Sequence, residues 1–121
     1  MTRNLDLIRY ILLTIENSTD RVMYIEDFAA EDFTPDVVSY HIGLLLECSY
    51  INAVKMGGLG QKYAQYKVWG LTSHGHDYLD AIKNDTVWSR TKNAIKDFGS
   101  SVSFEIIKST AIQIISKSLG L

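Results

Sequence analysis

Two histidines and an aspartate stand within four residues, at His74, His76 and Asp77. Imidazole nitrogens and carboxylate oxygens are suitable ligands for zinc. The chain has three histidines in all, however, and neighbouring side chains in the first turn of a helix fan apart rather than converge. We therefore expect no metal site and interpret this stretch as the start of a helix, where Asp77 is favourable near the positive end of the dipole.

Nucleophilic catalysis has equally little support in the sequence. Cys48 is the one cysteine, and no activating partner stands near it. Its place after the leucines at 44–46 predicts a small buried hydrophobe, and His41 is expected to be an interior histidine and not a base. The glycine-rich residues 57–60 lack the Lys-Ser/Thr ending of a phosphate-binding loop. We expect neither an enzyme nor a bound cofactor.

The candidate contact residues for nucleic acid or a protein partner lie on the exposed face of one helix and on a hairpin: Ser39, Tyr40, Gly43, Lys55, Lys62 and Lys67. The same helix face carries Asp36 and Glu47 and no cation. A recognition helix usually turns Arg, Lys, Asn or Gln toward base edges, and a carboxylate repels phosphates. The helix face therefore argues against double-stranded DNA as the partner, whereas the hairpin lysines argue for it.

The helix that would carry this face is predicted over residues 34–48. Thr34 has a suitable N-cap side chain, and Pro35 occupies the first helical position, where proline is best tolerated. Val38, Ile42 and the leucines at 45–46 recur at the spacing of one buried face.

A hairpin is predicted directly after this helix. Residues 51–55 alternate like a strand, the glycines of residues 56–60 suit a tight tip, and residues 63–71 form the return strand. Tyr63, Tyr66 and Trp69 either pack the hairpin onto helices or offer a stacking surface for bases. We favour packing, with Trp69 as the more buried side chain.

The remaining segments are mainly helical. The patterns predict a helix over residues 4–16, a short strand over 22–25, one or two helical turns within 26–33, and a helix capped by Thr72. A second cap at residues 84–86 begins a helical stripe of Val87, Trp88, Thr91, Ile95 and Phe98 that Gly99 ends. A last helix over 103–119 has a broad apolar face.

Composition places the chain among ordinary globular proteins. It has 121 residues, a net charge of −2 and 46% hydrophobic residues. Nine acidic and three basic residues give the first 50 positions a charge of −6, and the remainder carries five acidic and nine basic residues, or +4. No apolar run approaches the ~20 residues of a membrane span, and no signal peptide pattern is visible. We expect a cytoplasmic protein without a membrane partner.

Two local patterns resemble the winged helix-turn-helix superfamily. One is the helix of residues 40–47 leading into Tyr50 and Ile51, and the other is Leu71-Thr72 followed by Gly75, Tyr78 and Leu79. The chain is also similar to a family of small bacterial and prophage proteins of unknown function, in residues 5–9, the His41 helix, residues 71–82 and residues 85–88. The resemblance implies the fold and a bacterial or phage origin, but no site residues.

These observations predict an α+β, mainly helical winged helix with a two- or three-stranded wing over residues 1–99. The helix at 100–121 packs either on the body or on a second chain as a homodimer. We expect a DNA-binding or regulator-like module that acts through the wing and helix 34–48. The alternative is a protein–protein interaction module with an acidic face and no DNA binding.

Overall fold

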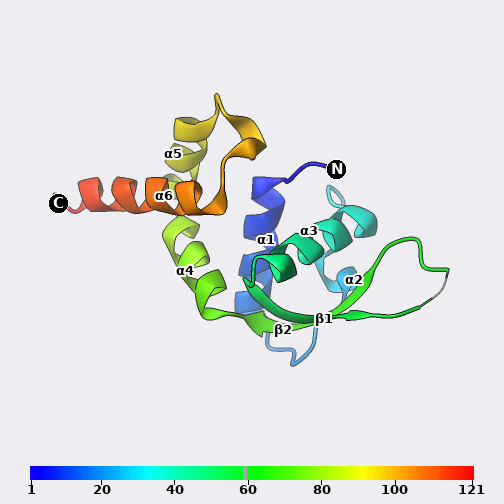
Figure 1. The fold of residues 1–121 in the computed structure, drawn as a ribbon. Coiled ribbons are helices and arrows are strands. Elements are labelled where there is room, and N and C mark those ends of the chain that lie inside the picture. Colours follow the sequence, from blue (N-terminus) through cyan, green and yellow to red (C-terminus); the bar gives the residue numbers. More distant parts are fainter. Residues whose placement is uncertain (59) are drawn as a thin grey trace. The chain divides into compact units, whose positions relative to one another are not determined.

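The computed structural model describes residues 1–58 and 60–121, except the side chain of Ser100. The described residues form two compact units, Met1–His76 and Asp77–Leu121. Together they contain six α-helices, one short 3-10 turn and a two-stranded antiparallel sheet (Figure 1): α1 (Leu5–Asn17), α2 (Ile25–Phe28), α3 (Pro35–Glu47), β1 (Ile51–Met56), β2 (Gln65–Leu71), α4 (Ser73–Ile82), α5 (Asp85–Ile95), η1 (Gly99–Ser101) and α6 (Phe104–Ser118). The expected mainly helical α+β class is confirmed. None of the helices in this described part has the length and apolar character needed to cross a bilayer.

The core of unit 1 forms where α3 packs against α1 and α2 and where all three helices pack against β2. Asn4 caps α1, because its side-chain oxygen accepts a hydrogen bond from the Leu7 amide at 3.1 Å. The completely buried apolar side chains here come from α1, α2, α3 and β2: Leu7, Ile8, Ile11, Leu12, Ile25, Phe28, Val38, Ile42, Leu45 and Val68. Burial of this apolar set stabilises the unit.

The strand predicted over residues 22–25 is wrong. Only Met23 pairs with β2, through two backbone hydrogen bonds with Val68 at 2.7 and 2.9 Å. Helix α2 then begins at Ile25, and Asp27 stabilises this start, because its carboxylate accepts from the Tyr24 amide at 2.7 Å while its own amide donates to the Tyr24 carbonyl. Because of this reciprocal cap, Ile25 is the first residue of a helix and not part of a strand. The sheet therefore has two strands.

Helix α3 has the predicted start and the predicted buried face. Thr34 is its N-cap residue, but the predicted side-chain cap is absent, because the Thr34 hydroxyl donates to the Asp36 carboxylate instead. Pro35 lies in the first turn. Val38, Ile42 and Leu45 are completely buried, and Leu46 is half-buried. At the other end, Ser49 adopts a left-handed conformation with φ of 60°. The Ser49 amide donates to the Leu46 carbonyl, and the Tyr50 amide donates to the Leu45 carbonyl. This is the hydrogen-bonding pattern of a Schellman motif, and it turns the chain directly into β1.

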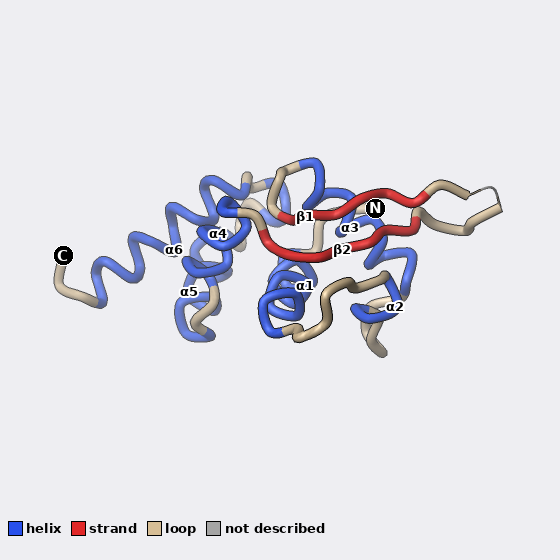
Figure 2. The backbone as a smooth tube through the Cα atoms, turned by 90° about the horizontal axis from the view of Figure 1, so that it is seen from below, coloured by secondary structure: helices blue, strands red, loops and turns tan. Residues whose placement is uncertain are grey.

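The predicted hairpin is present (Figure 2), and β1 pairs antiparallel with β2. Its loop extends away from the helices of unit 1, and Gly60 in that loop has φ of +82°, a conformation that favours glycine. Leu59, in the middle of the predicted tip, lies outside the described residues. The prediction that Trp69 is buried is wrong, since its side chain is 53% exposed. Tyr66 and Val68 point toward the helices, so the alternation of a strand turns Trp69 to the opposite face.

Gly75 allows a close contact at the start of α4. The Thr72 hydroxyl accepts from the Gly75 amide at 3.1 Å, which confirms Thr72 as the cap, and the Thr72 amide donates to the Tyr50 carbonyl at 3.0 Å. A Cβ atom at position 75 would lie 1.9 Å from that same carbonyl oxygen. Glycine is therefore required where α4 begins.

Unit 2 contains the rest of α4 together with α5 and α6. Asn84 caps α5 by accepting from the amides of Thr86 and Val87, and α5 packs along α6. Tyr78 and Phe104 meet edge to face, with ring centroids 5.3 Å apart. The predicted stripe on α5 is correct as far as Ile95 but wrong for Phe98, because α5 ends at Ile95 and Phe98 is exposed.

The left-handed residue at the end of α3 leads to a prediction about stability. Serine has a steric cost in this conformation that glycine avoids, although glycine loses more backbone entropy on folding. We expect Ser49→Gly to raise the free energy of unfolding by about 0.5–1 kcal/mol in urea denaturation. Ser49→Ala is the control, because alanine keeps the steric cost and should not stabilise the protein. Equal or lower stability of the glycine variant would contradict this account of the helix end.

Candidate functional site

A groove lies between α3 and the segment of chain that enters β2. It encloses about 340 Å³. Its walls combine two carboxylates, three tyrosines and small or apolar residues: Asp36, Ser39, Tyr40, Gly43, Leu44, Glu47, Tyr63, Ala64 and Tyr66. The face of α3 that the sequence predicts to be its outer side therefore forms one wall of a cavity with the hairpin.

Two contacts set the floor of this groove. Ser39 Oγ donates a hydrogen bond to the Ala64 carbonyl oxygen at 2.5 Å. The expectation that Ser39 faces solvent is wrong, because the returning chain covers it and leaves it 4% exposed. Beside it the Tyr66 hydroxyl lies against Gly43, where a Cβ atom would come within 2.9 Å of that oxygen.

The groove is acidic. Asp36 is exposed, and the hydroxyl of Thr34, which donates to its carboxylate at 2.5 Å, lowers the pKa of Asp36 below its ordinary value. Asp36 is consequently ionised at neutral pH. Glu47, also exposed, lies at the other end of the helix face. Burial raises the pKa of Tyr66, and the charge of Glu47 raises it further, so this phenol stays protonated.

Aromatic side chains line the same groove as the two carboxylates. Tyr40 is 37% exposed on α3, while Tyr63 and Tyr66 come from the hairpin side. Sequence reasoning placed Tyr40 and Gly43 among the contact residues but left out Tyr63 and Ala64. These two residues precede β2, which begins at Gln65, two residues later than predicted. They could have been found only by predicting that this segment folds back against α3.

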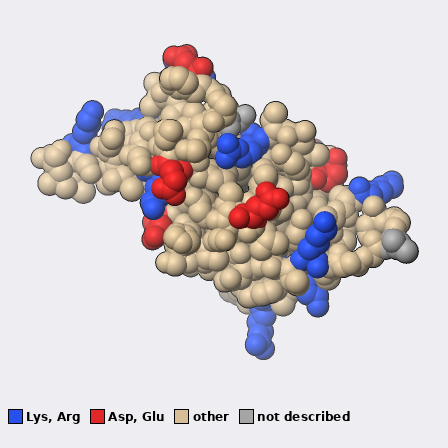
Figure 3. Space-filling view, in the orientation of Figure 1, with Lys and Arg blue, Asp and Glu red and all other residues tan. Residues whose placement is uncertain are grey.

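The predicted lysines lie elsewhere on unit 1. Lys55, Lys62 and Lys67 are exposed on the hairpin, and none of the described residues that line the groove is basic. Figure 3 shows basic side chains standing out along the hairpin, with acidic side chains nearby rather than on a separate face. The six predicted contact residues therefore do not form one surface, because Ser39, Tyr40 and Gly43 line the acidic groove and the three lysines lie outside it.

Cys48 is exposed at the end of α3, so the prediction of a buried hydrophobe is wrong. The chain turns away at Ser49, and position 48 is therefore the helix end and not part of the buried face. Protein atoms around the sulfur exclude enough water to raise the pKa of the thiol, Arg3 lowers it, and Glu47 raises it again. The neutral thiol predominates at neutral pH, which leaves little nucleophilic thiolate.

His41 is completely buried, which confirms it as an interior residue. Its Nε2 accepts a hydrogen bond from the Asn4 amide at 2.8 Å, and its Nδ1 donates to the Val37 carbonyl oxygen at 2.8 Å. Both ring nitrogens are therefore used in the neutral form. Burial lowers the pKa of His41, although the hydrogen bond to Val37 partly opposes this.

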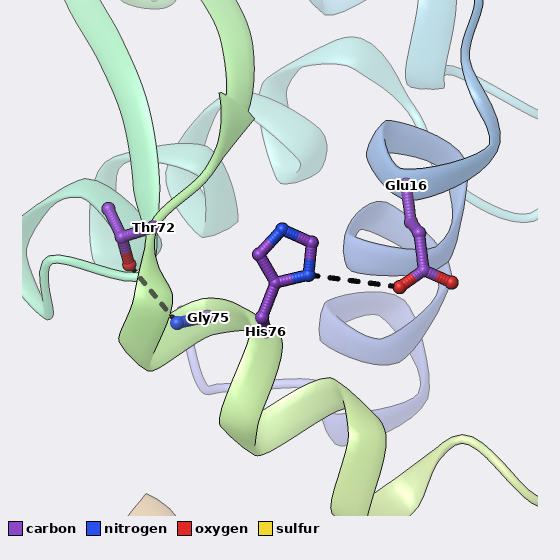
Figure 4. Close-up of polar contacts among 4 residues, drawn as sticks. All are labelled: Glu16, Thr72, Gly75 and His76. Atoms are coloured by element: carbon purple, nitrogen blue, oxygen red, sulfur yellow. Dashed lines mark hydrogen bonds and ion pairs between the residues drawn. The ribbon is translucent and has the colours of Figure 1, made fainter.

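The histidines near the start of α4 do not gather around one point. His76 points from α4 toward α1, where its Nδ1 lies 3.9 Å from Glu16 Oε2 (Figure 4). Across the part of the chain that the structure describes, no three His, Cys, Asp or Glu side chains are close enough together to hold a metal ion.

Comparison with known proteins places this small, mainly helical α+β protein in a family. The chain belongs to the DUF2513 family of hypothetical proteins, whose profile matches residues 2–102. It is also 37% identical over 120 residues to an uncharacterised protein of Haemophilus influenzae, an alignment that spans 99% of this chain and 100% of that relative. No solved structure matches it significantly. The expected similarity to a family of unknown function is confirmed.

The buried histidine makes stability depend on pH. Because the folded pKa of His41 is depressed, the unfolded chain takes up its proton first as the pH falls below about 6.5, while the folded imidazole stays neutral. We expect the free energy of unfolding to fall below this pH, by at most about 1.4 kcal/mol per pH unit for one proton.

Urea unfolding at pH 7.5 and pH 5.5 measures this effect. His41→Gln keeps an acceptor for the Asn4 amide but cannot titrate, so its stability should change less between the two pH values. His74→Gln, at an exposed position, is the matched control and should behave like the unaltered protein. The same pH dependence in all three proteins would rule out His41 as the cause.

Proposed function

We propose that this protein is a non-catalytic binding module that takes a basic segment of a protein partner into the groove of α3. The observation that carries the proposal is the composition of that groove, in which two carboxylates occur together with three tyrosines and the described lining contains no cation. Such a surface is complementary to arginine or lysine side chains.

The spacing of the groove suits an extended basic segment. Asp36 and Glu47 are eleven residues apart on α3, which corresponds to about 16 Å along a helix at 1.5 Å per residue. A guanidinium or ammonium group can pair with either carboxylate, and its flat or charged face can rest on a tyrosine ring. Tyr40 and Tyr63 supply such rings in the same lining.

A second candidate function is binding of double-stranded DNA through the hairpin. Lys55, Lys62 and Lys67 are exposed there, and a helix followed directly by a two-stranded hairpin, α3 and then β1 and β2, supports this candidate. Fold analogy is a limited argument for function, and three lysines are fewer than the about six to ten phosphate contacts of a strong binder. The carboxylates of α3 would also repel the phosphates if that helix approached the duplex.

Fluorescence anisotropy with two probes separates these functions. One probe is a fluorescein-labelled peptide with four arginines spaced by glycines, and the other is a labelled 20-base-pair duplex, both at low salt. We expect the protein to bind the arginine peptide and not its citrulline counterpart, which has no charge. The double variant Asp36→Asn/Glu47→Gln should bind the peptide about tenfold more weakly or worse.

The matched control is Asp20→Asn/Glu26→Gln. It removes the same two charges from exposed positions that do not line the groove, and it should retain peptide binding. Equal losses in both double variants would mean nonspecific attraction and would reject the groove. Duplex binding that strengthens when Asp36 and Glu47 are neutralised would instead support the DNA-binding function.

A further inference from the structure

The sheet of unit 1 has an outer face that the groove of α3 does not use. Helices α1, α2 and α3 pack on the side that carries Tyr66 and Val68 (Figure 1). We call the opposite side the outer sheet face. It collects four apolar side chains that are each between 38% and 53% exposed: Val22, Tyr24, Val54 and Trp69. Exposed apolar side chains gathered on one face are typical of an interaction surface.

Lys67 lies at the centre of the outer sheet face. On one side it pairs with Val54 of β1. On the other side Tyr24 lies opposite it, because Met23 forms an antiparallel bridge with Val68 and the backbone of Tyr24 is still extended, with φ of −120° and ψ of 169°. The face therefore places a cation between an apolar side chain and an aromatic ring.

Trp69 is the extra residue of a β-bulge in β2. Residues 53 and 68 pair with each other and the next pair is 52 with 70, so the pairing passes over Trp69. Bulges are frequent beside functional sites, where they re-aim a side chain. Here the indole is the most exposed of the four apolar side chains on the face.

We propose that the outer sheet face binds single-stranded DNA, with one base stacked on Tyr24, another on Trp69 and a phosphate paired with Lys67. Tyr24 and Trp69 are diagonal neighbours, because Trp69 follows two residues after Lys67. Diagonal neighbours lie about 7–8 Å apart, and two steps of a nucleic-acid strand at about 3.4 Å each cover nearly the same distance. Any base can stack on an aromatic ring, so this face requires no particular sequence.

Lys67 distinguishes single-stranded DNA from the other occupants that an apolar face could have. An apolar protein surface would bury its ammonium group without a counter-charge. A second copy, paired through this face about a two-fold axis, would bring two Lys67 side chains together. A duplex keeps the faces of its bases stacked inside and presents only their edges, so the two rings would not be used.

The apolar side chains favour DNA over RNA. Val54 pairs with Lys67, Val22 lies opposite Trp69, and neither valine side chain has a hydrogen-bonding group. A ribose 2′-hydroxyl held against them would lose its water without gaining a partner. Deoxyribose avoids that cost.

The charge around the outer sheet face is modest. Arg21 and Lys55 are exposed close to it in sequence, but the exposed Asp20 and Glu26 offset them. Stacking must therefore contribute more to binding than phosphate contacts do. We expect the loss of either ring to weaken binding more than the loss of Lys67.

Fluorescence anisotropy of the full chain with fluorescein-labelled ten-nucleotide probes at low salt tests the proposal. We expect binding of oligothymidine, and binding about tenfold weaker or worse of an abasic strand, which keeps every phosphate but has no bases. Trp69→Ala and Tyr24→Ala should each weaken oligothymidine binding about fivefold or more. Tyr40→Ala is the matched control, because Tyr40 is 37% exposed, close to the 40% of Tyr24, but lines the acidic groove.

Tryptophan fluorescence reports the stacking itself. The chain has two tryptophans, and Trp88 is only 4% exposed, so quenching by oligothymidine should come from Trp69. Trp69→Phe should retain most of the binding, because phenylalanine also stacks, but should lose the quenching. Asp36→Asn/Glu47→Gln should not weaken binding of oligothymidine, so this experiment and the test of the groove are independent.

Equal binding of the abasic strand, or of a duplex of the same length, would mean attraction by charge alone and would overturn the proposal. Equal or tighter binding of oligouridine would overturn the choice of DNA. A peptide of alternating glutamate and tyrosine that binds more tightly than oligothymidine and displaces it would identify an acidic protein as the partner instead. The proposal also fails if oligothymidine does not bind at tens of micromolar protein, or if Trp69→Ala and Tyr24→Ala both bind it normally. Circular dichroism checks that each variant is folded.

Discussion

The contact between α3 and the returning strand of the hairpin determines the shape of the candidate site. Tyr66 is buried with its hydroxyl against Gly43, and Ser39 is tied to the backbone at Ala64. A side chain at position 43 would press on the Tyr66 hydroxyl, so the absence of one lets the hairpin approach the helix. That approach turns a helix face into the wall of a groove and places Tyr63 in the same lining as Tyr40.

The contact between α3 and the hairpin determines where the charged residues of unit 1 lie. The acidic residues of α3 remain at the two ends of the groove, and the lysines of the hairpin remain outside it. A helix with this surface is poorly suited to a polyanion. The hairpin gives one exposed element a positive charge, while the groove next to it stays negative.

Local signals in the sequence were sufficient for most of the helices. Thr34 with Pro35, Thr72 with Gly75 and Asn84 each marked a helix start that the structure confirms. The Thr72 and Asn84 signals succeed because a cap is a contact between residues that are close in sequence. At α3 the Thr34 hydroxyl bonds to Asp36 and not to a backbone amide, so only the position of the helix start was correct. The prediction of a strand at residues 22–25 was wrong because a second local interaction opposed it. Its β-forming side chains were visible, but the reciprocal cap of Asp27 competed for the same residues.

The site was harder to predict because it depends on contacts between distant residues. The helical period placed Ser39 on the outer face of α3, but the segment that covers it comes from Ala64, twenty-five residues later. Cys48 and Phe98 were misplaced since each follows the point where its helix ends, and a periodic pattern does not show that point. Side chains alternate between the two faces of a strand, so Trp69 lies on the face opposite Tyr66. Its exposure could therefore have been predicted from the sequence.

Titration of the ¹⁵N-labelled protein with the arginine peptide, followed by amide chemical shifts, tests the central claim most directly. The account predicts that saturable shift changes concentrate at Asp36, Tyr40, Glu47 and Tyr63, around the groove. Shift changes that are spread equally over the other exposed acids of unit 1, such as Asp20 and Glu26, would contradict it, as would the absence of any change in α3.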